Sequence, residues 1–225
     1  MEYKTDKEIS DFKEMFSESR LHIIIHTFLW AIALYTMLSF LHIDIVYNVL
    51  GLLSIIIFIL IITRKATGQH YMIYSWICLA CVMACGVAAG RLIYIEMLLP
   101  MIIYVSVLDV ISFTRVGKKT TNAKLMNSNK WLPRLLVYGR SFKTGEPVVT
   151  KGYGDYLWYS ITFAAIYTAY GKTIGLVAIL AIIIGVLINL IIINRIYKYR
   201  WYRGFPATVG PLGLCTILLV ILYII

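Results

Sequence analysis

Seven stretches of mostly apolar residues dominate the sequence, and each is close to the length needed to cross a lipid bilayer. A spanning helix takes about 20 mostly apolar residues. The stretches are 21–41, 44–63, 71–90, 92–114, 154–170, 173–193 and 205–225. Only Gly90 and Arg91 separate the third from the fourth, and Gly171 and Lys172 separate the fifth from the sixth, which favours helical hairpins. The sequence therefore predicts an all-α membrane protein with about seven transmembrane helices.

The composition supports the same fold class. Hydrophobic residues make up 60% of the chain and charged residues 14%, whereas soluble domains carry roughly 25% charged residues. The four cysteines lie inside apolar stretches, so we expect no disulfide framework. The chain starts with many charged residues instead of a short basic stretch followed by an apolar one, so we also expect no cleavable signal peptide.

The positive charges are distributed unevenly over the segments between the apolar stretches. Beyond residue 20 the chain has 17 Lys and Arg residues, of which 15 fall on one side of the predicted bundle and only Arg91 and Lys172 on the other. The positive-inside rule then predicts a multi-pass protein of the cell membrane, with the N-terminus and the loop 115–152 in the cytoplasm and the C-terminus outside. We interpret the net charge of +10 as a topology signal and expect no nucleic-acid partner, because no folded basic domain is predicted.

Four regions follow from these patterns. They are an amphipathic N-terminal segment (1–20), an N-terminal four-helix part (21–114), a cytoplasmic loop (115–152) and a C-terminal three-helix part (153–225). In the first region, apolar residues recur at helical spacing, at Ile9, Phe12, Met15 and Phe16; a frayed, solvated start is the alternative. In the loop, the β-prone segments 135–138 and 147–150 flank a turn-rich stretch and predict a short hairpin, with a disordered loop as the alternative.

Two acidic residues lie within the predicted spans, near their cytoplasmic ends. Asp109 stands six residues before Arg115, and Asp155 stands four residues after Lys151. At 1.5 Å per residue these positions lie about 9 Å and about 6 Å inside the membrane, at similar depths. Ionisable groups in a membrane are costly and usually mark function.

Each of these aspartates lies on a polar stripe of its helix, which suggests a face turned toward a wet interior. The stripes are Ser106, Asp109 and Ser112 on one helix, and Asp155, Tyr159 and Thr162 on the other. Two carboxylates close together cannot both ionise, so they share a proton. The ionised one can activate a water while the protonated one polarises a scissile carbonyl. A structural polar contact or an ion path would use the same two residues.

The motif GYGD at 152–155, followed by YLWYS, resembles the GxGD motif of presenilin and signal peptide peptidase. The order of an aspartate, a loop and then GxGD is similar too, and the FPAT segment with Pro206 and Ala207 resembles the Pro-Ala-Leu motif of that family. The resemblance implies a presenilin-like bundle and a compact, prokaryotic intramembrane aspartyl protease. Asp109 and Asp155 would share the acid and base roles. It also implies transmembrane proteins as substrates and no metal or organic cofactor.

The resemblance further implies a set of substrate-binding residues: Gly152, Tyr153, Gly154, Pro206, Ala207 and Thr208. The two glycines would let a substrate backbone approach Asp155, although a plain turn into the helix would need them as well. Pro206 would fit the first turn of the last helix. The predicted hairpin would add an unwound substrate strand. Leu108 and Thr208 depart from the family pattern, which has a tyrosine and a leucine there.

Other functions remain open at this point. A prepilin or preflagellin peptidase also uses a GxGD aspartate, but it places its first aspartate in or after an early helix and cleaves just outside the membrane. A transporter or ion-leak protein would keep the two aspartates without needing the glycines or Pro206. The pair His22 and His26 lacks the glutamate of a HExxH zinc motif, so we interpret it as a packing feature and expect no metal site.

Overall fold

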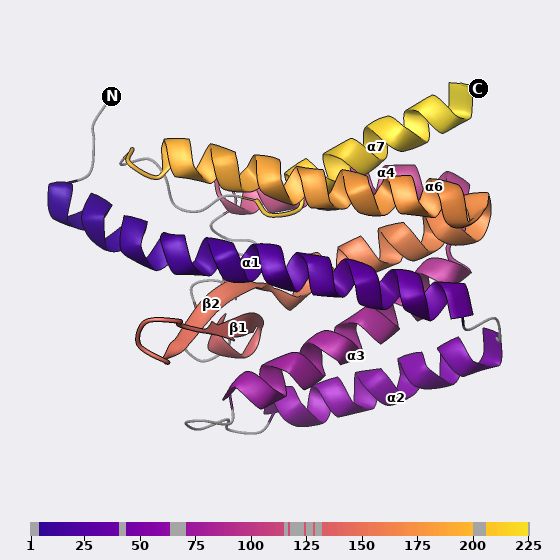
Figure 1. Ribbon diagram of the computed structural model, residues 1–225. Coiled ribbons are helices and arrows are strands. Elements are labelled where there is room, and N and C mark those ends of the chain that lie inside the picture. The colour runs from indigo at the N-terminus through magenta and orange to yellow at the C-terminus, as the bar shows by residue number, and fades with distance from the viewer. Residues whose placement is uncertain are drawn as a thin grey trace.

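The computed structural model describes residues 5–40, 44–63, 71–114, 132–199 and 206–224, together with the single residues 117, 124 and 128. In these residues six helices and two strands follow one another, with a short 3-10 turn, Leu132–Arg134, before the strands. The helices are α1 (Asp6–Phe40), α2 (Asp44–Thr63), α3 (Tyr71–Leu92), α4 (Ile95–Ser112), α6 (Tyr153–Ile196) and α7 (Val209–Ile224), and the strands are β1 (Leu136–Arg140) and β2 (Pro147–Gly152). Figure 1 shows the long helices side by side with the strands at one end of the bundle.

The structure confirms a mostly helical protein with apolar helices that are candidate membrane spans. Within the described residues, five helices are long and apolar enough to cross a membrane, namely α1, α2, α3, α4 and α6. The sixth helix, α7, is equally apolar but has 16 residues. The outer face of α2 exposes large apolar side chains, among them Leu52, Ile56 and Ile59, which is typical of a surface that faces lipid.

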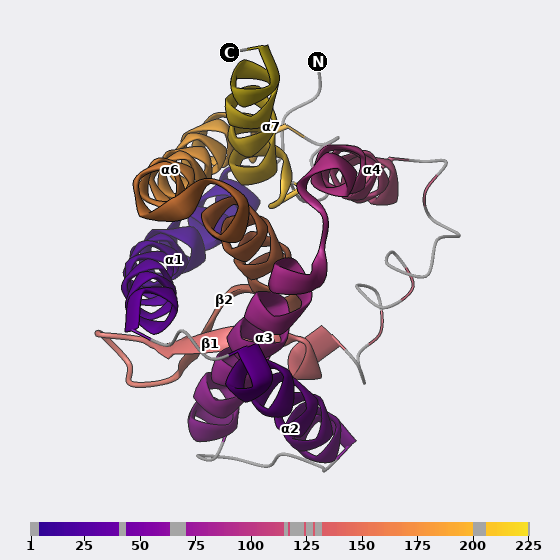
Figure 2. The ribbon, with the colours of Figure 1, turned by 90° about the vertical axis from the view of Figure 1, so that its right-hand side faces the viewer.

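Gly171 divides α6 into two legs. Its backbone has φ 79° and ψ −173°, a combination that is essentially restricted to glycine because a side chain would collide with the backbone. The chain therefore turns back at this residue, and Figures 1 and 2 show the two legs running beside each other. The apolar stretches 154–170 and 173–193 thus form one kinked element whose legs stay in contact.

The first predicted region is not a separate helix. α1 runs without a break from Asp6 to Phe40, because no glycine or proline interrupts these residues, and both residue types disfavour helix interiors. Of the four apolar positions predicted there, the side chains of Ile9 and Phe12 lie outside the described part. Phe16 belongs to the core, whereas Met15 is exposed.

The first leg of α6 forms the centre of the bundle, and every residue from 159 to 167 is buried. α1 and α3 pack against it, whereas α7 packs against the second leg. On α3, Gly86 and Gly90 permit a close approach, because a methyl group at Gly90 would collide with the backbone carbonyl of Ile161. Small residues bring helix backbones together in this way in membrane proteins. On the α1 side, the Trp30 indole donates a hydrogen bond to Ser160 Oγ at 2.9 Å.

The predicted hairpin is confirmed. β1 and β2 pair antiparallel, with a bulge between Val137 and Tyr138. Thr150 Oγ1 donates to the Val137 carbonyl at 2.8 Å, which adds a side-chain bond at the bulge. The hairpin contacts α3 through β1 and α1 through β2, and Figure 2 shows it between these helices.

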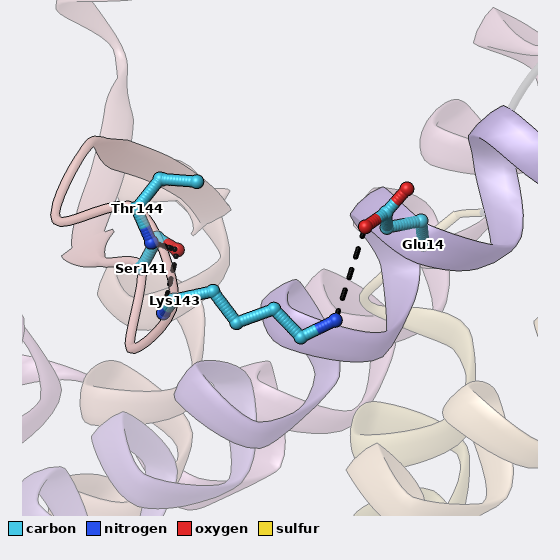
Figure 3. A network of polar contacts seen from close by, with 4 residues as sticks. All are labelled: Glu14, Ser141, Lys143 and Thr144. Atoms are coloured by element: carbon cyan, nitrogen blue, oxygen red, sulfur yellow. Dashed lines mark hydrogen bonds and ion pairs between the residues drawn. The ribbon is translucent and has the colours of Figure 1, made fainter.

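Hydrogen bonds within the hairpin turn stabilise it, and an ion pair connects the turn to α1. Ser141 Oγ accepts hydrogen bonds from the backbone N–H groups of Lys143 and Thr144, as Figure 3 shows. Lys143 Nζ lies 3.8 Å from Glu14 Oε1, with both side chains largely exposed. Such a solvated ion pair stabilises by about 0–1 kcal/mol, so apolar packing must do most of the holding.

Two histidines of α1 supply apolar packing, one toward the hairpin turn and one toward α3. The His22 ring stacks on Phe142 with centroids 4.9 Å apart, and the His26 ring meets Trp76 edge-on at 4.6 Å. Both histidine side chains are buried. Within the described residues, no group of three or more His, Cys, Asp or Glu side chains is placed to hold a metal ion. His22 thus packs the hairpin turn against α1, whereas His26 packs against Trp76 of α3, in line with the packing interpretation.

Candidate active site

The hairpin sets the position of the GYGD segment. β2 ends at Gly152 and α6 begins at Tyr153, with no loop between them. The Tyr153 N–H donates to the Leu135 carbonyl at 3.0 Å, which extends the pairing of the sheet onto the first residue of the helix. Asp155 therefore lies in the first turn of α6, and the register of the two strands fixes where that turn begins.

The two glycines of GYGD have different surroundings. A Cβ added at Gly152 would lie 3.4 Å from Asp155 Oδ2, whereas one added at Gly154 would meet no described atom within 4 Å. The Asp155 carboxylate thus folds back toward Gly152. Gly154 is exposed and leaves free space beside the aspartate.

Asp109 is bound to the segment that precedes α7. It lies in the last turn of α4, and its Oδ2 accepts two hydrogen bonds from Thr208, one from the backbone N–H at 3.2 Å and one from the hydroxyl at 2.6 Å. Thr208 is buried and comes directly before α7. The positive end of the α7 dipole therefore faces the Asp109 carboxylate, which favours its negative charge.

Pro206, Ala207 and Thr208 of the FPAT segment lie outside the last helix. α7 begins at Val209, so Pro206 precedes it by three residues, and the expectation that Pro206 forms the first turn is wrong. Pro211 occupies that turn instead, where the missing N–H of proline costs no hydrogen bond. Pro206, Ala207 and Thr208 form an irregular stretch that leads into α7.

Both legs of α6 hold this stretch through one carbonyl. The Ala207 carbonyl accepts a hydrogen bond from the Tyr159 hydroxyl at 2.7 Å and another from Asn189 Nδ2 at 2.8 Å. Tyr159 lies on the first leg and Asn189 on the second. Ala207 is therefore fixed at a position that leaves Thr208 in reach of Asp109.

A buried lysine completes the network. Lys151 is only 8% exposed, and its Nζ donates to the Tyr159 hydroxyl at 2.8 Å and lies 4.5 Å from the centroid of the Tyr159 ring. Its charge interacts with those of Asp155 and Asp109. Burial lowers the pKa of Lys151 to about 8, although the two carboxylates act in the opposite direction.

Asp109 and Asp155 form a carboxylate pair. They belong to α4 and α6, which pack against each other, and their charges interact. Both residues are partly exposed. When two carboxylates interact in this way, ionisation of one disfavours ionisation of the other, so one can act as a base and the other as an acid toward a water molecule.

Tyr153 and Leu108 lie apart from this arrangement. The Tyr153 side chain is buried, packs edge-on against Phe58 with centroids 5.6 Å apart and donates to the Ser75 carbonyl at 3.3 Å. Its side chain thus anchors the start of α6 to α2 and α3. Leu108 is 39% exposed.

Two residues of this network were not expected from the sequence. In the sequence Lys151 is one of several positive charges in the loop, and Asn189 lies within a long apolar stretch. A signal for Asn189 exists, because a lone amide within a run of isoleucine and leucine has to find a polar partner. Lys151 had no comparable signal, since its burial depends on how the hairpin docks.

A comparison of the chain with family models, with curated proteins and with solved structures found no match to any of them.

Proposed function

We propose that this protein is an intramembrane aspartyl protease that hydrolyses peptide bonds in or near the transmembrane segments of other membrane proteins. The observation that carries the proposal is the placement of two carboxylates, from α4 and α6, close enough for their charges to interact. Thr208 fixes one of them with two hydrogen bonds. Such fixed pairs are what acid–base hydrolysis requires.

The proposed reaction needs one ionised and one protonated carboxyl group. The ionised carboxylate takes a proton from a water molecule, whose oxygen then attacks the carbonyl carbon of the scissile peptide. The protonated carboxyl gives its proton to the carbonyl oxygen, which produces a tetrahedral diol. The first carboxyl, now protonated, gives its proton to the peptide nitrogen, the C–N bond breaks, and one diol hydroxyl gives its proton to the second carboxylate. An amine and a carboxylic acid are released, and the pair again holds one proton.

Substrate access would use the open space beside Gly154 and the hairpin. A transmembrane helix has to unwind before its peptide bonds are exposed, and an unwound segment can gain main-chain hydrogen bonds from a strand edge. The hairpin is continuous with α6, so a segment paired with it would lie beside Asp155. In this proposal Gly152, Gly154, Pro206, Ala207 and Thr208 line the path of the substrate backbone.

The proposed membrane topology counts seven spans, with the two legs of α6 as separate spans and α7 as the last. The distribution of Lys and Arg places the N-terminus and the hairpin in the cytoplasm. The site would then open toward the cytoplasmic boundary of the bilayer, and the resemblance to presenilin supports the same sense.

The experiment is cleavage in proteoliposomes that contain only the purified protein and a labelled single-span substrate. Asp109→Asn and Asp155→Asn each remove one carboxylate while keeping its shape. Glu96→Gln is the matched control, because Glu96 lies on the same helix as Asp109 but in its first turn. We expect cleavage by the wild type and the control, and a loss of at least about a thousandfold in each aspartate variant, because neither residue can do the work of the other.

The same vesicles separate the other functions. Cleavage confined to a soluble segment next to the membrane would identify a prepilin-type peptidase. A flux of protons or solutes that depends on both aspartates, without any cleavage product, would identify a transporter and refute the protease proposal.

A further inference from the structure

We propose that Lys151 is a positioning residue for the carboxylate pair, whose ammonium group holds the pair in the state with one proton. This inference rests on the proposed function for its catalytic meaning. The electrostatic interaction between Lys151 and the two aspartates does not depend on that function. The residue comes directly before the GYGD segment and lies outside the set of site residues expected from the sequence.

The geometry gives the lysine a fixed place. Its side chain is 92% buried, since 8% is exposed, and its Nζ is held by the hydrogen bond to the Tyr159 hydroxyl at 2.8 Å. The Tyr159 ring lies 4.5 Å from Nζ and the Tyr156 ring 5.8 Å, both within the range of cation–π attraction. A lysine that only marked topology would extend its ammonium group into water.

The groups that face Lys151 come from each neighbouring element. α4 contributes Asp109, and α6 contributes Asp155, Tyr156 and Tyr159. On the α1 side, His26 Nδ1 lies 3.4 Å from Thr150 Oγ1, the residue before the lysine. The two aspartates are therefore the anionic partners among these groups.

Charge balance then selects the protonation state. A partly buried cluster is least costly when its net charge is zero, because desolvation penalises each uncompensated charge. With one ammonium group, that condition is met when one carboxyl is ionised and the other is protonated. This is the state that the proposed hydrolysis needs, so the lysine would keep the resting enzyme ready for catalysis.

The same lysine also connects the two halves of the site. Nζ donates to Tyr159, and the Tyr159 hydroxyl donates to the Ala207 carbonyl at 2.7 Å. Ala207 precedes Thr208, which binds Asp109. A purely structural role would use this chain of hydrogen bonds and nothing else, so the test has to separate the charge from the hydrogen bond.

Three variants make that separation. Lys151→Gln keeps a donor for Tyr159 but has no charge, Lys151→Met has neither, and Lys151→Arg keeps the charge. The first readout is the dependence of kcat/KM on pH in proteoliposomes. Loss of the cation makes the ionised carboxyl easier to protonate, so we expect the acidic limb to move to higher pH by about one unit in the Gln and Met variants. The Arg variant should restore the limb.

The second readout does not need activity. The side-chain amine of Lys151 is followed by NMR in protein labelled with ¹³C-lysine, and the resonance is assigned with Lys151→Arg. Because both carboxylates raise the pKa of this lysine, we expect its midpoint to fall by about one pH unit in Asp109→Asn and in Asp155→Asn. Glu96→Gln should leave it unchanged.

The outcomes are distinguishable. If the titration midpoint of Lys151 is the same in Asp109→Asn, Asp155→Asn and the wild type, the inference is refuted, whether or not the protein cleaves substrates. If the acidic limb of the pH profile does not move in Lys151→Gln and Lys151→Met while the maximal rate falls, the lysine has a structural role only. That result also refutes the inference. If the midpoint responds to both aspartates but no substrate is cut, the lysine is coupled to the pair and the protease proposal alone fails.

Discussion

Thr208 donates two hydrogen bonds to one oxygen of Asp109, from its backbone N–H at 3.2 Å and from its hydroxyl at 2.6 Å. The two residues are 99 positions apart in the chain. Threonine stands here where the Pro-Ala-Leu motif has leucine, so the departure from the family pattern supplies a donor that leucine lacks. The backbone contact does not depend on the side chain, whereas the hydroxyl contact does.

Removing the Thr208 hydroxyl should reduce catalysis. A hydrogen bond to a charged group contributes about 1.5–3 kcal/mol, so Thr208→Val should lower kcat/KM by about 10- to 100-fold. Thr208→Ser keeps the hydroxyl and should retain most of the activity. Thr216→Val is the matched control, because that hydroxyl binds only the Leu212 carbonyl of its own helix. Equal activity in Thr208→Val and wild type would mean that the hydroxyl contact does not matter for the reaction.

The two donors to the Ala207 carbonyl should behave as a unit. Tyr159→Phe or Asn189→Leu leaves that carbonyl with one partner, whereas the double variant leaves it with none. An unpaired buried carbonyl costs about 1–3 kcal/mol. The double variant should therefore lose more stability than the sum of the single variants, as measured by unfolding in detergent. Additive losses would indicate that the two bonds act independently.

A substitution at Gly154 can test substrate access without a loss of stability, because the space beside this residue is open. A methyl group there meets no described atom within 4 Å, and alanine favours a helix more than glycine does, so Gly154→Ala should unfold at the same temperature as the wild type or at a higher one. If a substrate backbone passes this position, the methyl group will obstruct it, and kcat/KM should fall by about tenfold or more, equivalent to about 1.4 kcal/mol. Unchanged cleavage of the labelled substrate by a stable Gly154→Ala protein would exclude this path.

The kink of α6 should depend on its glycine. Gly171 has φ 79°, and a residue with a side chain pays about 1–3 kcal/mol in that conformation. Gly171→Ala should therefore destabilise the protein by about this amount in thermal unfolding. Gly213→Ala is the control, because it lies within α7 and its added methyl group also meets open space. A similar unfolding temperature for both variants would contradict the role of the positive φ.

The stability of the protein should rise with pH in a window set by Lys151. Its pKa in the folded state is about 8, below the ordinary value of 10.5. Between these values the unfolded chain binds more protons than the folded one, so stability increases with pH by at most about 1.4 kcal/mol per unit. Below pH 8 the lysine is protonated in both states and contributes no slope.

The matched variant for this prediction is Lys151→Met, which cannot titrate. The difference in free energy of unfolding between wild type and variant should change across pH 8 to 10.5 in favour of the wild type. A difference that is flat over this range would show that the lysine titrates alike in both states.

The helices were predictable because their cause is local. An apolar stretch of sufficient length marks a membrane helix by composition alone, and the hairpin followed from β-prone residues on either side of a turn. The continuity of α1 does not follow from the sequence pattern, because the change from charged to apolar residues near residue 20 resembles a boundary between segments. A helix has no reason to end at such a change unless a glycine or proline is present.

The site was only partly predictable. The two aspartates were recognisable, because a charge within an apolar stretch is costly and therefore conspicuous. The contacts that hold them depend on tertiary structure: Tyr159 reaches Ala207 across 48 residues, and Thr208 reaches Asp109 across 99. Lys151 is buried where the end of the hairpin meets Tyr156 and Tyr159 of α6, and no periodicity in the sequence reports such packing.

The most direct test of the account is the cleavage of a single-span substrate in proteoliposomes prepared in H₂¹⁸O, with the products analysed by mass spectrometry. We predict a cut within or beside the membrane span, with one ¹⁸O atom in the new carboxyl terminus, for the wild type and Glu96→Gln. Asp109→Asn and Asp155→Asn should give no product. Cleavage that persists in either aspartate variant would contradict the claim that these two residues act as a pair.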